Sequence, residues 1–134
     1  NLIHAIDPRG FSTLLLASYF GNEAMTKLIL QFEPDVNFKD NAGNTALMGA
    51  CFKGLSSIAK LLIDAGADIN AVNKNKTTAL SFAATYGQLS MVLLLLEHGA
   101  DTSITDQNNK SAYDHAISNG HHEIADLLKN KISR

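Results

Sequence analysis

Tryptophan is absent from this chain, and cysteine, proline, aromatic residues and charge are all scarce. Of the 134 residues, one is Cys, two are Pro, 7% are aromatic and 18% are charged. The single cysteine, Cys51, excludes an intramolecular disulfide and an all-cysteine zinc site, and it fits a reducing compartment such as the cytoplasm. Hydrophobic residues make up 46% of the chain, which is the composition of a globular domain and not of a disordered segment.

The charge balance and the short hydrophobic runs exclude further classes of function. A net charge of −2 leaves no broad basic surface for a nucleic-acid backbone or an anionic membrane. The longest apolar run, Met91 to Leu96, has six residues, whereas roughly 20 are needed to span a bilayer. No glycine-rich phosphate loop is present. We therefore expect no nucleic acid, no membrane and no cofactor as partners.

The sequence repeats itself every 33 residues, in four copies. Five columns of like residues keep this register, which chance does not produce, and such a period is typical of stacked repeat proteins. The columns are Asp7, Asp40, Asn73 and Asp106; Ser12, Thr45, Thr78 and Ser111; Ala17, Ala50, Ala83 and Ala116; Gly21, Gly54, Gly87 and Gly120; and Leu28, Leu61, Leu94 and Leu127.

Each column has a physical reason. A Ser or Thr side chain accepts hydrogen bonds from the free amides of a first helical turn, so this column predicts the N-cap of a short helix. Alanine suits a close approach of two helices, and the glycine column ends the helix in a left-handed conformation. A second helix follows, with an i, i+3, i+4 apolar stripe such as Ile58, Leu61 and Leu62.

These residues resemble the ankyrin repeat. The second copy carries the pattern best, from Asp40-Asn41-Ala42-Gly43-Asn44-Thr45-Ala46-Leu47 through Gly54 and Ile58-Ala59-Lys60-Leu61-Leu62 to Gly66-Ala67-Asp68-Ile69-Asn70. The resemblance implies an all-α solenoid of paired antiparallel helices with protruding β-turn loops. We expect a single domain over 1–134, with repeats at about 7–39, 40–72, 73–105 and 106–134, and 1–6 as the end of a preceding turn.

The chain departs from the family pattern at several turns. The full Thr-Pro-Leu-His box, whose histidine braces the turns, is missing, so we expect other contacts to brace them. Lys76 and Asn109 stand where Gly43 supplies a turn glycine, and both should need positive φ. The segment Phe32-Glu33-Pro34-Asp35 replaces Ala-Gly-Ala-Asp, which predicts a differently shaped turn at Glu33, with Phe32 and Phe38 packed under it.

The two ends differ in character. The last repeat presents polar residues, among them His122, Glu123 and Asp126, which is typical of a terminal repeat. The first residue is not Met, and Leu2-Ile3-His4 aligns with Asp35-Val36-Asn37. We expect either that an upstream segment is missing or that the first repeat is an apolar, partly exposed start.

The resemblance implies a protein partner, bound on the concave face that turn tips and first helices form. Exposed aromatic residues are typical interface anchors, and Tyr19, Phe20, Phe52 and Tyr86 should form a stripe on this face. Its lysines favour an acidic or phosphorylated partner, and we expect the chain to be a monomer. The candidate partner-binding residues are Arg9, Phe11, Tyr19, Phe20, Lys39, Asn41, Asn44, Phe52, Lys53, Val72, Lys74, Asn75, Thr77, Tyr86 and Gln107.

Catalysis and metal binding find little support in the sequence. Cys51 occupies a packing column with Ser18 and Ala84, and no base or oxyanion partner stands at a recognisable spacing. His121 and His122 are adjacent, so their side chains diverge on a helix. We therefore expect no catalytic or metal-binding residues and no enzyme. An enzyme that uses the array as a scaffold, and a spacer or recognition arm of a larger protein, remain as alternatives.

Overall fold

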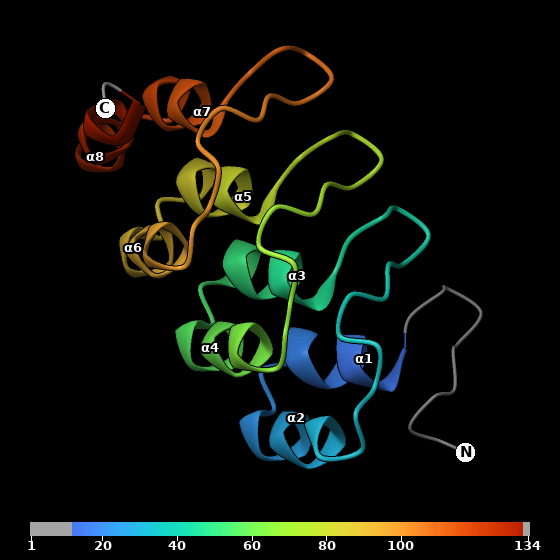
Figure 1. Ribbon diagram of the computed structural model, residues 1–134. Coiled ribbons are helices and arrows are strands. Elements are labelled where there is room, and N and C mark those ends of the chain that lie inside the picture. The colour runs from blue at the N-terminus through green and yellow to red at the C-terminus, as the bar shows by residue number, and fades with distance from the viewer. Residues whose placement is uncertain (1–11, 133–134) are drawn as a thin grey trace.

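The computed structural model describes residues 12–132, which form four pairs of antiparallel helices stacked in a row (Figure 1). The odd-numbered helices form one layer, the even-numbered helices form the other, and a long turn projects beside each odd-numbered helix from the second repeat onward. The pairs are α1 (Thr13–Tyr19) with α2 (Glu23–Leu30), α3 (Ala46–Lys53) with α4 (Ser56–Asp64), α5 (Ala79–Thr85) with α6 (Leu89–Glu97), and α7 (Ala112–Ser118) with α8 (His122–Ile132). The expected all-α solenoid is confirmed.

The predicted caps define both ends of the first helices. The side chains of Ser12, Thr45, Thr78 and Ser111 each accept a hydrogen bond from the backbone amide of the third helical residue. At the other end, the repeated glycine has a left-handed backbone in all four copies, with φ between 70° and 77°. Because both signals lie in the sequence, the boundaries of these helices follow from local chemistry.

The core lies between the two helical layers. The repeated alanine is fully buried at Ala50, Ala83 and Ala116, and its small side chain allows neighbouring odd-numbered helices to approach. Large side chains from both layers fill the space between them, including Leu47, Leu80, Met91, Leu95 and Leu128. Across residues 12–132, no helix combines the length and the apolar character that a membrane crossing needs.

The protruding turns are braced by the first column of the repeat. A side-chain oxygen of Asp40 accepts hydrogen bonds of 2.9 Å from the amides of Ala42 and Asn44. Asn73 and Asp106 do the same in the next two turns. In the Asp40 and Asn73 turns this confirms that contacts other than a histidine provide the support. Successive turns also bond to one another, since the amide of Lys74 donates to the carbonyl of Ala42 at 3.1 Å.

The turn after α2 does not have the altered shape that the sequence predicted. Glu33 has φ 52°, so it adopts the glycine-like conformation of Gly66 and Gly99, and that prediction is wrong. A left-handed conformation costs a non-glycine residue about 1–2 kcal/mol. The turn also has one hydrogen bond fewer than the equivalent turn of the second repeat. There the amide of Ala67 donates to the carbonyl of Leu62 at 3.0 Å, whereas Pro34 at the equivalent position has no amide hydrogen.

Other predictions for the turns and ends are mixed. Lys76 and Asn109 have the expected positive φ, 63° and 59°. Phe38 packs against the core as expected, whereas Phe32 is 57% exposed, so its predicted packing is wrong. The polar residues of the last repeat are exposed on α8. Predictions for residues 1–11, including the end of a preceding turn, lie outside the described residues.

Candidate functional site

Four aromatic side chains lie exposed at the ends of the odd-numbered helices. Tyr19 is 43% exposed, Phe20 71%, Phe52 37% and Tyr86 50%. They form two pairs in edge-to-face contact, the ring centroids of Tyr19 and Phe20 lying 5.8 Å apart and those of Phe52 and Tyr86 4.6 Å apart. The expected stripe is therefore exposed, but it is divided into two clusters.

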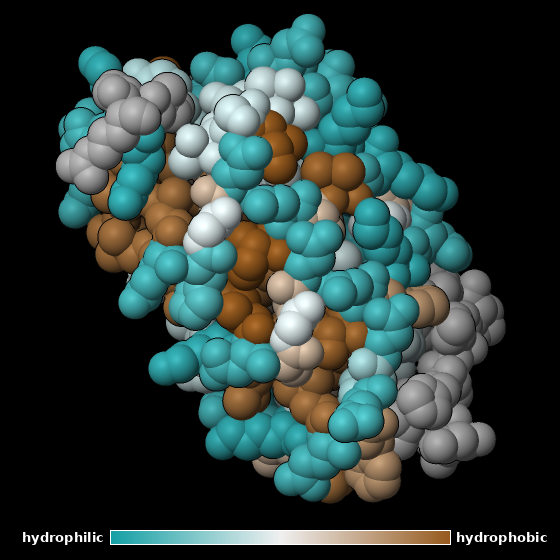
Figure 2. Space-filling view, in the orientation of Figure 1, coloured by the Kyte–Doolittle hydropathy of each residue, from teal (hydrophilic) through white to brown (hydrophobic). Residues whose placement is uncertain are grey.

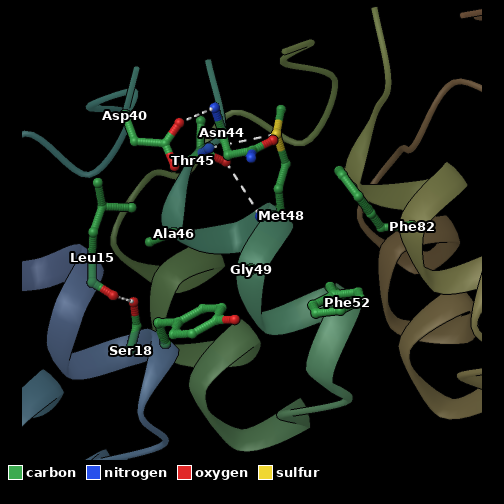
Figure 3. Close-up of a pocket in the computed structure, with 11 residues that line it drawn as sticks. Leu15, Ser18, Asp40, Asn44, Thr45, Ala46, Met48, Gly49, Phe52 and Phe82 are labelled. Atoms are coloured by element: carbon green, nitrogen blue, oxygen red, sulfur yellow. Dashed lines mark hydrogen bonds between the residues drawn. The ribbon is translucent and has the colours of Figure 1, made fainter. Parts of the chain in front are cut away.

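A pocket of about 300 Å³ lies between these two clusters. Figure 3 shows its contributors: Leu15 and Ser18 come from α1, Met48, Gly49 and Phe52 from α3, and Phe82 from α5, with the Asp40 turn at one end. Its lining residues are Leu15, Ser18, Tyr19, Asp40, Asn44, Thr45, Ala46, Met48, Gly49, Phe52 and Phe82.

The pocket exists because residue 49 has no side chain. The same position in the other repeats carries Leu16, Phe82 and His115. A β-carbon at Gly49 would lie 3.5 Å from Cδ1 of Tyr19, in ordinary contact, so the space above this glycine is open. Glycine inside a helix costs about 1 kcal/mol relative to alanine. This site was not predicted from the sequence, although a glycine in a column of large residues signals missing volume at this position.

Phe82 also belongs to this site. It lies one turn before Tyr86, and it packs against the core while only partly buried. Its ring lies 6.4 Å from that of Phe52, in an edge-to-face arrangement. Phe82 therefore forms part of the pocket wall as well as part of the core.

Two lysines of the candidate set hold backbone carbonyls of the neighbouring repeat. Lys53 donates to the carbonyl of Tyr19 at 2.7 Å, and its Nζ lies 4.3 Å from the centroid of the Tyr19 ring. Lys39 donates to the carbonyl of Val72 at 2.7 Å. Both side chains are exposed, so a positive charge stands beside the pocket wall and another beside the adjacent turn.

The other candidate residues lie on the turns. Asn41, Lys74, Asn75 and Gln107 are exposed at the tips. Asn44, Val72 and Thr77 are half-buried and have structural contacts. Asn44 accepts a bond from Asn73, Thr77 donates its amide to Asn73, and Val72 forms an isolated bridge with Thr78. Arg9 and Phe11 lie outside the described residues.

The possible catalytic groups are engaged in packing or capping. Cys51 is fully buried, and burial raises the pKa of its thiol well above the usual range, so it stays protonated at neutral pH. The predicted packing position is confirmed. His121 contacts the carbonyl of Thr85 at 3.1 Å. Within residues 12–132, no group of three or more His, Cys, Asp or Glu residues is placed to hold a metal ion.

His115 and Asp106 form a close pair that our sequence analysis missed. Their Nε2 and Oδ2 atoms lie 2.7 Å apart. Burial opposes ionisation of Asp106, but hydrogen bonds from His115 and from the amides of Lys110 and Asn108 outweigh it and lower its pKa. Asp106 organises the last turn and His115 lies on α7, so the pair ties this turn to its helix, and here a histidine does brace the turn although the usual turn histidine is missing.

Figure 2 shows apolar side chains running diagonally over the helical layers of one face, while polar side chains dominate the edge at the turn tips.

Comparison with known proteins agrees with this architecture. The family description "Ankyrin repeats (3 copies)" matches residues 1–73 and 57–133. A search of curated proteins returns no match. The 33-residue columns, the stacked helix pairs and this match together show that the chain belongs to the ankyrin-repeat family.

Proposed function

We propose that this chain is a protein-interaction module that binds its partner on the concave face, formed by the turn tips and the odd-numbered helices. Ankyrin repeats are generally protein–protein interaction modules and typically non-catalytic. The observation that carries the proposal for this face is the exposure of four aromatic side chains, Tyr19, Phe20, Phe52 and Tyr86, of which Tyr19 and Phe52 line one pocket. A few large aromatic residues contribute most of the binding energy in typical interfaces.

The even-numbered helices also expose apolar residues, which provides an internal comparison. Leu28 on α2 and Leu93 on α6 are each 48% exposed. They are aliphatic and belong to separate repeats, whereas Phe52 and Tyr86 belong to neighbouring repeats and touch. Met25, one turn before Leu28, is 43% exposed as well, so α2 carries a small aliphatic patch. An aromatic pair such as Phe52 and Tyr86, with Phe52 lining a pocket, is more typical of a binding site.

The test is a pull-down from the native cell with the unmodified chain and with the double variant Phe52→Glu, Tyr86→Glu. We expect the double variant to lose the partner, because each change puts a carboxylate into the aromatic cluster. The matched control is Leu28→Glu with Leu93→Glu, which makes the same change at similar exposure on the other layer. The control should keep the partner.

Folding must be separated from binding in this experiment. Phe52 is 37% exposed and contacts Phe82, so its substitution also perturbs packing. Circular dichroism identifies a variant that unfolds, and Phe20→Glu with Tyr86→Glu then replaces it, since these side chains are 71% and 50% exposed. A folded concave-face variant that retains every partner overturns the proposal and favours a spacer role.

A further inference from the structure

We propose that the pocket over Gly49 receives one large apolar side chain from an acidic peptide segment of the partner, with a carboxylate of that segment at Lys53. This inference rests on the proposed function and deepens it, because it states which chemistry the concave face recognises. Three features carry it: the shape of the pocket, the excess of lysines on the concave face, and the placement of Asp40 and Lys53 beside the pocket.

The pocket suits a single side chain. Its volume of about 300 Å³ lies at the small end of ligand sites, and it is open to the surface. The rings of Tyr19, Phe52 and Phe82 contribute to its walls. An aromatic ring, a leucine or a methionine that enters can contact these rings edge-on or face-on, which favours a large apolar group.

The charges of the concave face favour a negatively charged peptide. The turns and odd-numbered helices, residues 12–21, 39–54, 72–87 and 105–120, carry five lysines and three carboxylates. The remaining described segments carry four lysines and nine carboxylates. The net charge of the chain is negative, yet the described part of its concave face has an excess of two positive charges, so an acidic segment is attracted to this face more than to the rest of the described surface.

The carboxylates of this face do not neutralise its lysines. Asp40 bonds the amides of its own turn, Asp106 bonds its turn and His115, and Asp114 bonds Ser111. Among residues 12–132, none of these three forms an ion pair with a lysine of the face. The five lysines are Lys39, Lys53, Lys74, Lys76 and Lys110.

The two charges beside the pocket give the bound segment a direction. Asp40 lines the pocket at the turn end, where a second carboxylate is repelled. Lys53 lies beside Tyr19, with its Nζ bonded to the Tyr19 carbonyl and stacked over the ring. An acidic residue next to the apolar anchor is therefore stabilised on the Lys53 side and destabilised on the Asp40 side.

The experiment uses a random-peptide display library selected on the unmodified chain. Affinities of the enriched peptides are then measured for four variants. Gly49→Leu fills the pocket with the residue that α1 carries at the same position, Leu16, so the helix accommodates it. Gly49→Ala fills it partly. Lys53→Gln removes the charge, and Lys60→Gln is the matched control, an exposed lysine on α4.

We expect enriched peptides to share a large apolar residue next to Asp or Glu. Gly49→Leu should weaken their binding by about tenfold or more, as loss of a buried anchor does, and Gly49→Ala by less. Lys53→Gln should weaken binding and reduce its salt dependence, while Lys60→Gln should change neither. Thermal unfolding of each variant confirms that binding, and not folding, has changed.

The contrary outcomes are distinct. Peptides without acidic residues, or binding that survives Gly49→Leu in a folded chain, overturn this inference and leave the proposed function standing. The inference alone also fails if the chain captures a partner in the pull-down but enriches no peptide. Failure of the chain to bind in both experiments overturns the proposed function as well.

Discussion

Gly49 offers a test in which stability and binding should move in opposite directions. It lies inside α3 (Ala46–Lys53), where glycine is about 0.8–1.0 kcal/mol less favourable than alanine. The added β-carbon would meet Cδ1 of Tyr19 at 3.5 Å, an ordinary contact, so no steric cost offsets the gain. We therefore expect Gly49→Ala to raise the free energy of unfolding by about 1 kcal/mol, with a rise in Tm of about 3–5 °C.

The assay is urea unfolding followed by far-ultraviolet circular dichroism, with the free energy obtained by linear extrapolation. Gly54→Ala is the contrasting control, because Gly54 has φ 75° and its added β-carbon would lie 2.5 Å from Oε1 of Gln88. That substitution should destabilise the chain by about 1–2 kcal/mol. If Gly49→Ala also destabilises, this position needs glycine for packing, and the interpretation of the pocket as open space is refuted.

Three further predictions concern the turns. Glu33→Gly should raise the free energy of unfolding by about 0.5–1 kcal/mol in urea titrations, because it removes left-handed strain at φ 52°; a loss of stability would show that the turn is unstrained. Asn70→Ala removes the side-chain oxygen that accepts a hydrogen bond from the Asp101 amide at 2.8 Å. It should lower the free energy of unfolding by about 0.5–1.5 kcal/mol and accelerate hydrogen exchange at that amide. Unchanged exchange would contradict the hydrogen bond. Because the pKa of Asp106 is lowered on folding, its carboxylate contributes fully to the free energy of unfolding above the unfolded pKa of about 3.9, and this contribution is lost as pH falls through the lower folded value. Asp106→Asn should therefore make the free energy of unfolding fall less steeply with pH on the acid side. An unchanged acid side would argue against the lowered pKa.

The sequence was sufficient to predict the fold because each repeat has local signals for its own boundaries. Thr45 and Thr78 cap helices where their column predicts, and Gly54 and Gly87 end them with positive φ. These signals act within a few residues of the chain, so they can be read without knowledge of tertiary contacts. The 33-residue register then fixes which helices stack on which.

One feature that escaped prediction, the turn at Glu33, lies within a single repeat, and another, the pocket, depends on contacts between repeats. Glu33 adopts a glycine-like turn, a result that its own sequence does not favour. The pocket requires Tyr19, Gly49, Phe52 and Phe82, which come from three different helices, so no local pattern shows it. The glycine was visible in its column, but only the spatial arrangement shows that the missing side chain leaves an open pocket between two aromatic clusters.

The most direct test of the concave-face proposal is oxidative footprinting of the chain with and without the partner recovered in the pull-down. Tyr19, Phe52 and Tyr86 on the odd-numbered helices are 43%, 37% and 50% exposed. Met25, Phe32 and Leu93, on or beside the even-numbered helices, are 43%, 57% and 48% exposed and serve as internal references. We predict that the partner protects the first three from labelling and leaves the second three unchanged. Protection of Met25, Phe32 and Leu93, with Tyr19, Phe52 and Tyr86 still labelled, would contradict the proposal.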